Sequence, residues 1–165
     1  MNILSIVLAL HTTTENLEIA IAYLDGDTLT HELTHVRQQS WHLGRELATQ
    51  IHTCLTEFCH SYDMGFKWSD VAFIAIAKGV GGYTSTRIGI VLARTLGEQL
   101  DVPVYAIDCD VIQQNALQND WQTSSQTQTQ QSLGLSLLSI AYHQWQQKIY
   151  PNWSEALPVY SSDYS

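Results

Sequence analysis

The chain is poor in positive charge. Its 165 residues include 7 Lys and Arg against 16 Asp and Glu, which gives a formal net charge of −9 and a pI near 5.0. Proteins that bind nucleic acids on their own do so through many cationic contacts with phosphates, which release counterions. The acidic balance therefore argues against direct nucleic-acid binding by this chain.

Cysteine and long apolar runs are also scarce. Cys54, Cys59 and Cys109 are odd in number and have no Cys-x-x-Cys spacing, so the sequence indicates neither a disulfide framework nor a zinc site. The histidines are too scattered for metal binding. No stretch reaches the roughly 18 uninterrupted apolar residues of a membrane span, and residues 3–10 lack the basic flank of a signal peptide. We therefore expect a cytoplasmic protein without a metal site or a membrane segment.

The hydrophobic residues, 45% of the chain, are enough for the core of one globular domain. Residues 2–10 are almost all aliphatic, which is typical of a strand buried on both faces. Residues 17–24 and 28–36 alternate in polarity on either side of an Asp-Gly-Asp turn. These three segments predict a meander of three antiparallel strands.

Helices and strands alternate after the meander. Apolar residues at helical spacing predict a first helix over residues 39–60 and a second over residues 84–100. Residues 71–77 and 104–107 are short apolar segments that predict two more strands. The order β-β-β-α-β-α-β predicts an α/β protein with the ribonuclease H-like fold, which actin-like (ASKHA) kinases and retroviral-type nucleases share.

The last third of the chain has a different composition. Residues 122–132 are all Gln, Ser or Thr, so they have nothing to bury and predict a linker. We therefore divide the chain into a ribonuclease H-like lobe at residues 1–121, the linker at 122–132 and a final segment at 133–165. The final segment predicts one docking helix and an irregular tail.

Catalysis in this fold needs carboxylates at the ends of the central strands. Nucleases use them to hold two Mg²⁺ ions, and actin-like kinases use an Asp in the first turn to orient Mg²⁺. Here His11 ends the first strand, and neither residues 2–10 nor residues 71–77 contain Asp or Glu. Asp108 and Asp110 follow the fifth strand, but two acids after one strand are more often part of a solvated turn. The sequence therefore predicts no catalytic residue and no cofactor.

Two polar segments are candidates for an anion site. Thr12 and Thr13 bring hydroxyls to the first turn, and Gly79, Gly81 and Gly82 interrupt the chain before the second helix. A glycine-rich turn at a helix start can direct backbone N–H groups at a phosphate. The Gly-Lys-Ser/Thr of a Walker A loop is absent, however, and the same residues can simply form tight turns. Both interpretations remain open.

A stripe of small side chains runs along the second predicted helix, because Gly89, Ala93 and Gly97 are spaced by four residues. Interior glycines cost about 1 kcal/mol each relative to alanine, so another backbone is expected to come close, either the protein's own sheet or a partner helix. Trp41 and Arg45 are one turn apart in the first predicted helix. The candidate interface residues are Trp41, Arg45, Arg87, Gly89, Ala93 and Gly97.

Residues 77–89, Ala-Lys-Gly-Val-Gly-Gly-Tyr-Thr-Ser-Thr-Arg-Ile-Gly, resemble the signature of the TsaB (YeaZ) family. That signature is a basic residue followed by Gly-Pro-Gly-Ser-Phe-Thr-Gly-Leu-Arg-Ile-Gly. Residues 8–14 resemble the family's Leu-Ala-Ile-Asp-Thr-Ser-Thr, and residues 102–107 resemble its Pro-Val strand. The resemblance covers about the first two thirds of the chain. It departs from the family at His11, which stands where the family has an acid.

The resemblance implies a non-catalytic scaffold that supports TsaD, the subunit that puts threonylcarbamoyl on the adenosine beside the anticodon of certain tRNAs. It implies docking through the first two helices, either on a TsaD-like subunit or on a second copy of the chain. Family members usually carry a second lobe, which is largely missing here, so that residues 133–165 resemble a remnant. Two alternatives remain: an actin-like enzyme that binds ATP or transfers phosphate, and a degenerate paralogue that only homodimerises.

Overall fold

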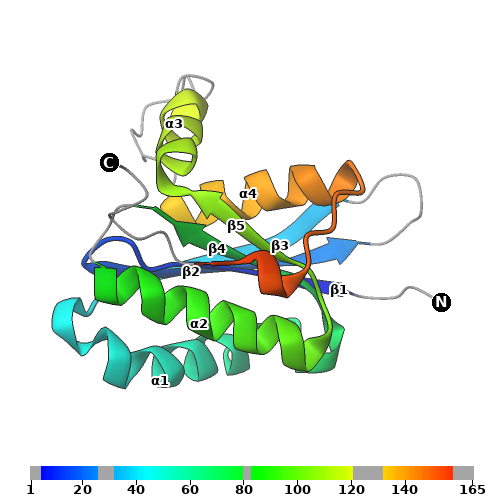
Figure 1. The fold of residues 1–165 in the computed structure, drawn as a ribbon. Helices are drawn as coiled ribbons and strands as arrows, with labels where there is room; N and C mark the ends of the chain where they lie inside the picture. Colours follow the sequence, from blue (N-terminus) through cyan, green and yellow to red (C-terminus); the bar gives the residue numbers. More distant parts are fainter. Residues whose placement is uncertain (1–4, 26–31, 80–82, 121–131, 158–165) are drawn as a thin grey trace.

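A computed structural model describes residues 5–25, 32–79, 83–120 and 132–157, and the statements below concern these ranges. One five-stranded sheet lies between two pairs of helices (Figure 1). The elements are, in chain order, β1 (Ser5–His11), β2 (Asn16–Asp25), β3 (Glu32–His42), the 3₁₀ helix η1 (Gly44–Glu46), α1 (Leu47–His60), η2 (Trp68–Asp70), β4 (Val71–Lys78), α2 (Tyr83–Leu100), β5 (Val104–Asp108), α3 (Cys109–Asp120), α4 (Leu133–Gln146) and η3 (Trp153–Glu155).

The strand order is β3-β2-β1-β4-β5, with β1 in the centre. β1 pairs antiparallel with β2, and β2 pairs antiparallel with β3, whereas β1, β4 and β5 run parallel. An antiparallel meander followed by two helical crossovers is the order predicted from the sequence. The structure therefore confirms the α/β, ribonuclease H-like fold.

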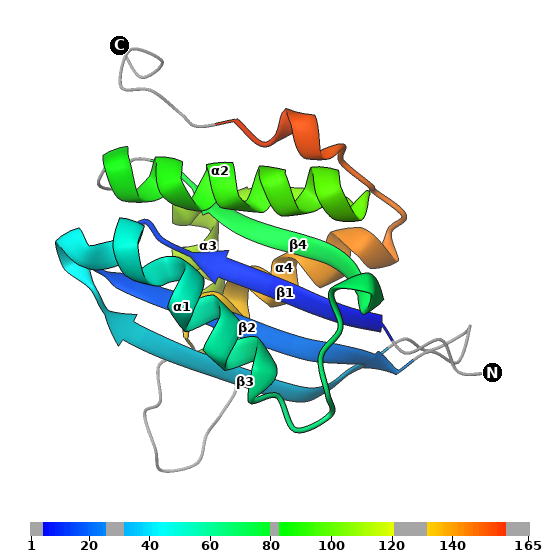
Figure 2. The same ribbon diagram turned by 90° about the horizontal axis from the view of Figure 1, so that it is seen from below.

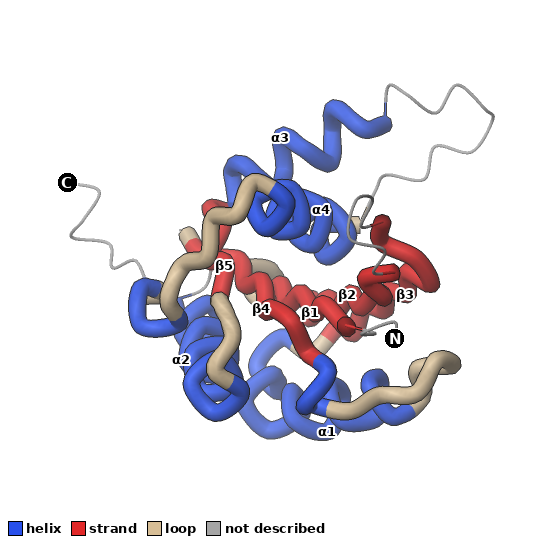
Figure 3. Tube along the Cα trace, turned by 90° about the vertical axis from the view of Figure 1, so that its right-hand side faces the viewer, coloured by secondary structure: helices blue, strands red, loops and turns tan. Residues whose placement is uncertain are grey.

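The two faces of the sheet are covered by different helices. α1 and α2 cover one face, with α1 against β2 and α2 against β4 (Figure 2). α4 covers the other face, and α3 starts at the end of β5 and packs against α4 (Figure 3). Large aliphatic residues such as Leu8, Leu10 and Ile76 point toward α1 and α2. Alanines such as Ala9 and Ala20 point toward α4, so this helix lies close to the strands.

The helix predicted over residues 39–60 begins later in the structure, where α1 starts at Leu47. β3 stays paired with β2 up to its last residue, His42, so Trp41 lies on a strand and Arg45 lies in η1. The Trp41 ring contacts the edge of Phe58 in α1, with the ring centroids 5.9 Å apart. The prediction that Trp41 and Arg45 share a helix face is therefore wrong, because strand pairing overrides the helical spacing of the apolar residues.

α3 was not predicted from the sequence. Within its described side chains only a few small or apolar residues, among them Ile112 and Ala116, are buried, so its apolar periodicity is weak. Its start is fixed by Asp108, whose Oδ1 accepts a hydrogen bond from the backbone N–H of Asp110 at 3.1 Å. Neighbouring β5 and α4 stabilise this helix, since local sequence contributes little.

The helix predicted after the linker is confirmed as α4, which contributes Leu137 and Leu138 to the same core as β1 and β2. Ser132 caps it by accepting a hydrogen bond from the N–H of Leu135 at 3.0 Å. The rest of the predicted linker, residues 121–131, lies outside the described residues. Among the described helices, none combines the length and apolar character that crossing a membrane requires.

Candidate functional site

The carboxyl ends of β1, β4 and β5 lie at one edge of the sheet, where open α/β sheets bind ligands. His11 ends β1, and Lys78 at the end of β4 is paired with Asp108 at the end of β5. Neither β1 nor β4 contains an acidic residue. This edge therefore lacks the carboxylates on neighbouring central strands that would hold catalytic Mg²⁺ ions.

His11 is buried, with 1% of its surface exposed, and burial lowers its pKa to about 4. The imidazole is therefore neutral at pH 7, and a neutral imidazole is a poor ligand for a hard cation. Its Nε2 lies 3.5 Å from the hydroxyl of Thr13, and its Nδ1 has no hydrogen-bond partner within the described ranges. At this position His11 cannot replace the acid of an actin-like kinase.

Glu18 stands opposite His11 in the β1–β2 pairing and is also largely buried. Its Oε1 accepts a hydrogen bond from the backbone N–H of Gly134 at 3.5 Å, at the start of α4. Burial raises the pKa of this carboxyl, and hydrogen bonds from the backbones of Gly134 and Leu133 act against that shift. Sequence analysis missed Glu18, although an acid at an inward position of an alternating strand marks a buried partner.

Thr12 and Thr13, proposed together for an anion site, point to different surroundings. Thr12 is completely buried beneath α2, where its hydroxyl oxygen occupies the space that a Cβ on Gly89 would need. Thr13 is partly exposed and lines a pocket at the sheet edge. The structure therefore brings only Thr13 to a surface that a ligand can reach.

Gly79 has a φ of +127°, and a Cβ at this position would lie 2.7 Å from the sulfur of Cys109. A glycine is needed at position 79, because the turn has a positive φ and α3 comes close to the backbone there. The other two glycines proposed for the anion site, Gly81 and Gly82, lie outside the described residues.

Asp108, Cys109 and Asp110 have their ligand atoms within 4.8 Å of one another, a spacing that a metal ion could bridge. However, Asp108 caps α3 through the N–H of Asp110. Burial, together with the neighbouring carboxylates of Asp108 and Asp110, raises the pKa of the Cys109 thiol, so the thiol stays protonated. The geometry therefore favours a helix cap.

The stripe of small residues on α2 faces the protein's own sheet. Ala93 is completely buried, and a Cβ on Gly97 would collide with Val104 of β5 and with Trp153 of η3. Of the two alternatives left open by the sequence, close packing on the sheet is correct. Gly89, Ala93 and Gly97 cannot themselves touch a partner, because the sheet and its neighbouring segments cover them.

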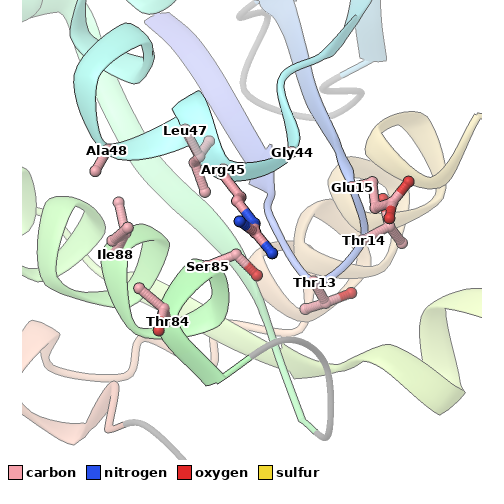
Figure 4. Close-up of a pocket in the computed structure, with 10 residues that line it drawn as sticks. All are labelled: Thr13, Thr14, Glu15, Gly44, Arg45, Leu47, Ala48, Thr84, Ser85 and Ile88. Carbon is pink, nitrogen blue, oxygen red and sulfur yellow. The ribbon is translucent and has the colours of Figure 1, made fainter.

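A pocket of about 550 Å³ lies between the turn after β1, η1 and the first turn of α2 (Figure 4). Arg45, one of the predicted interface residues, lines this pocket together with Thr13 and Thr84, and Leu47 and Ile88 supply apolar walls. This pocket could not be predicted from the sequence, because its residues come from three separate segments.

A second hollow, of about 420 Å³, lies between α1 and α2 on the outer surface of the helix layer. Its lining includes Arg87, the predicted interface residue that does face outward, with Ile51, His52 and Leu92. Val91 lies at the same groove with 55% of its surface exposed. A single exposed valine is common on protein surfaces, but Val91 lies over an apolar groove, which makes this face a candidate for contact with another protein.

Comparisons with known proteins agree with this geometry. A family model described as TsaD, tRNA N6-adenosine threonylcarbamoyltransferase, matches residues 43–123, just under half of the chain. The tRNA threonylcarbamoyladenosine biosynthesis protein TsaB of Bacillus subtilis (strain 168) is 35% identical over 95 residues, which cover 57% of this chain and 38% of that protein. The chain therefore spans well under half the length of the curated relative it matches.

Two solved structures show the same fold. YeaZ from Pseudomonas aeruginosa superposes with a TM-score of 0.73 at 18% identity, covering 94% of this chain and 99% of that one. RuvC from Thermus thermophilus superposes with a TM-score of 0.55 at 11% identity, covering 88% of this chain and 98% of that one.

The strand order and the solved structures define a ribonuclease H-like fold of the actin-like (ASKHA) type, in which β1 and β4 of this chain carry no acidic residue. Among proteins of this fold, the chain shares sequence with the Bacillus protein over 95 residues, and the glycine-rich segment lies at residues 77–89. The chain is similar to proteins of the TsaB (YeaZ) family.

Proposed function

We propose that the chain is a non-catalytic subunit that docks on a TsaD-like transferase and supports the threonylcarbamoylation of tRNA adenosine. The observation that carries this proposal is the 35% identity over 95 residues to a TsaB protein named for tRNA threonylcarbamoyladenosine biosynthesis. A role in tRNA modification would place the chain in the cytoplasm. The net charge of −9 is consistent with leaving the tRNA contacts to the partner.

The sheet edge supports the non-catalytic part of the proposal. β1 and β4 carry no acid, and the neutral, buried His11 stands at the end of β1. The alternative function, ATP binding or transfer by this chain itself, has one observation in its favour, which is the match of residues 43–123 to the transferase family model. ATP turnover by the purified chain would decide for this alternative, and we expect none above background.

The groove between α1 and α2 is the docking surface that we propose. Ile51 and Leu92 line it beneath the exposed Val91, and Arg87 and His52 lie along it. An apolar centre with a polar margin is the composition of a protein–protein interface. A helix pair of a partner can lie along this groove, since both α1 and α2 are exposed on their outer sides (Figure 2).

The test is a binding measurement between the full chain and the TsaD-like protein of the same cell. Val91→Glu places a charge in the groove and is expected to weaken binding by about tenfold or more. Val111→Glu is the matched control, because Val111 on α3 is 48% exposed but lies beyond the opposite face of the sheet. We expect this control to bind as the wild type does.

Three results would contradict the proposal. Absence of a complex between the wild-type chain and the TsaD-like protein would refute the partner, and equal weakening by both variants would refute the groove. A wild-type chain that forms only a homodimer, with Val91→Glu converting it to a monomer, would instead favour the degenerate homodimeric paralogue.

A further inference from the structure

The pocket beside η1 combines a cation, hydroxyls and apolar walls. Arg45 extends into the pocket from η1 toward Ser85 and Thr13 (Figure 4), and Thr84 lines it from the first turn of α2. Ile88 forms part of the apolar side. Its volume of about 550 Å³ lies within the range of small-molecule sites, about 300–1,000 Å³.

Arg45 has no ion-pair or hydrogen-bond partner among the residues that the structure describes, although acidic residues outnumber basic ones 16 to 7. Glu15 lines the same pocket without pairing with Arg45. A guanidinium has five N–H donors arranged to bind oxyanions. An unpaired arginine beside hydroxyls in an acidic protein therefore favours an anion that comes from outside the chain.

Backbone contacts hold Arg45 next to the turn after β1. The carbonyl oxygen of Glu15 accepts hydrogen bonds from the backbone N–H groups of Leu43 at 3.2 Å and Gly44 at 3.0 Å. Asn16 Oδ1 and His42 Nδ1 lie 2.9 Å apart and add a side-chain link between the same two segments. Because these contacts hold the turn after β1 and η1 together before binding, a ligand loses little affinity to ordering these two walls.

We propose that this pocket binds a small organic phosphate with an apolar body. A phosphate monoester has three terminal oxygens, which can accept hydrogen bonds from Arg45, Thr13 and Thr84 on three sides, whereas a carboxylate has only two oxygens in one plane. The apolar surfaces of Ala48 and Ile88 contact the rest of the ligand. This proposal does not depend on the docking of a transferase.

The first experiment compares four probes by titration calorimetry on the full chain. They are 1-naphthyl phosphate, 1-naphthoate, glycerol 3-phosphate and 1-naphthol. We expect 1-naphthyl phosphate to bind about tenfold or more tightly than each of the others, because each of those lacks either the phosphate or the apolar body. Equal binding of 1-naphthoate would overturn the assignment to phosphate, and no binding of any probe at millimolar concentration would overturn the site.

The second experiment assigns the binding to the pocket. Arg45→Gln is expected to weaken binding of 1-naphthyl phosphate about tenfold or more, and Thr84→Val, which removes a hydroxyl but keeps the shape, about fivefold. Lys67→Gln is the charge-matched control, because Lys67 is exposed and precedes the amino end of β4, at the other edge of the sheet. Urea midpoints show that each variant is folded. If Lys67→Gln weakened binding of 1-naphthyl phosphate as much as Arg45→Gln, the probe would be held by general attraction to positive charge, and the proposal would be overturned.

Discussion

The hydroxyl of Thr12 occupies the space that a Cβ at position 89 would fill, so Gly89 lets α2 lie directly on the end of β1. Thr12 is completely buried at this contact. The contact sets the distance between the turn after β1 and the first half of α2. Both the pocket with Arg45 and the groove with Val91 depend on that distance, because α2 forms one wall of each.

Gly89→Ala is expected to destabilise the fold by about 1–3 kcal/mol, although alanine favours helices by about 1 kcal/mol. The new methyl group would overlap Thr12 and lie 3.0 Å from Cδ1 of Ile76, and both neighbours are buried. Urea denaturation measures the loss.

Gly134→Ala in α4 is the matched control. Its Cβ would meet Glu18 Cβ at 3.4 Å and Ala20 Cβ at 3.7 Å, which are ordinary contacts. We expect this variant to be as stable as the wild type or more stable, by up to about 1 kcal/mol. Equal effects of the two substitutions would show that the Thr12 contact has no special role.

Ala93→Leu is expected to lower the free energy of unfolding by about 1–3 kcal/mol, because Ala93 is completely buried between α2 and the sheet. Val91→Leu, on the exposed side of the same helix, is expected to change stability by less than about 0.5 kcal/mol. Thermal unfolding of the two variants distinguishes them. A normally stable Ala93→Leu protein with weakened partner binding would mean that the stripe lies at an interface after all.

The order of strands and helices could be predicted from the sequence because each of these elements has its own apolar period. β1 is aliphatic throughout, and α2 repeats its apolar residues every three or four positions. α3 has no such period, so only its contacts with β5 and α4 make it a helix. Trp41 was misplaced because apolar residues near the end of β3 continue the spacing of α1.

The candidate sites were less predictable than the fold. The lack of an acid at His11 is visible in the sequence, since only the end of the first strand has to be located. The pocket was not visible, because Arg45 and Thr13 are far apart in the chain and meet through backbone hydrogen bonds of Glu15. The sequence also could not show whether the stripe of small residues faces the sheet or a partner. Its spacing fits both, and only the packing decides between them.

Tyr105→Phe is expected to loosen the segment that follows α4. The buried Tyr105 donates its hydroxyl to the carbonyl oxygen of Ile149 at 2.6 Å. Loss of this bond should cost about 0.5–1.5 kcal/mol and speed up proteolysis after α4. Tyr142→Phe is the control, because the Tyr142 hydroxyl accepts a bond at 3.0 Å from Gln146 on the exposed side of α4. Equal proteolysis of both variants would contradict a role for Tyr105 in holding this segment.

The buried His11 is expected to make the fold less stable in acid. Burial lowers the pKa of His11 from 6.5 to about 4 in the folded protein, whereas the unfolded chain takes up a proton near pH 6.5. Between these two pH values the unfolded state binds more protons, so the free energy of unfolding must fall as the pH is lowered from 6.5 toward 4. The loss attributable to His11 is at most about 3 kcal/mol, and above pH 6.5 this group has no effect.

His11→Asn removes the titrating group from the same position, so its stability is expected to change less than that of the wild type between pH 6.5 and 4. The raised pKa of Glu18 acts in the opposite direction, because the folded protein then binds a proton more readily than the unfolded chain. That contribution remains in both proteins, and the difference between their two stability curves therefore isolates His11. Urea denaturation at several pH values gives the curves. Parallel curves would mean that His11 keeps its ordinary pKa in the folded protein, and with it that the end of β1 is open to water.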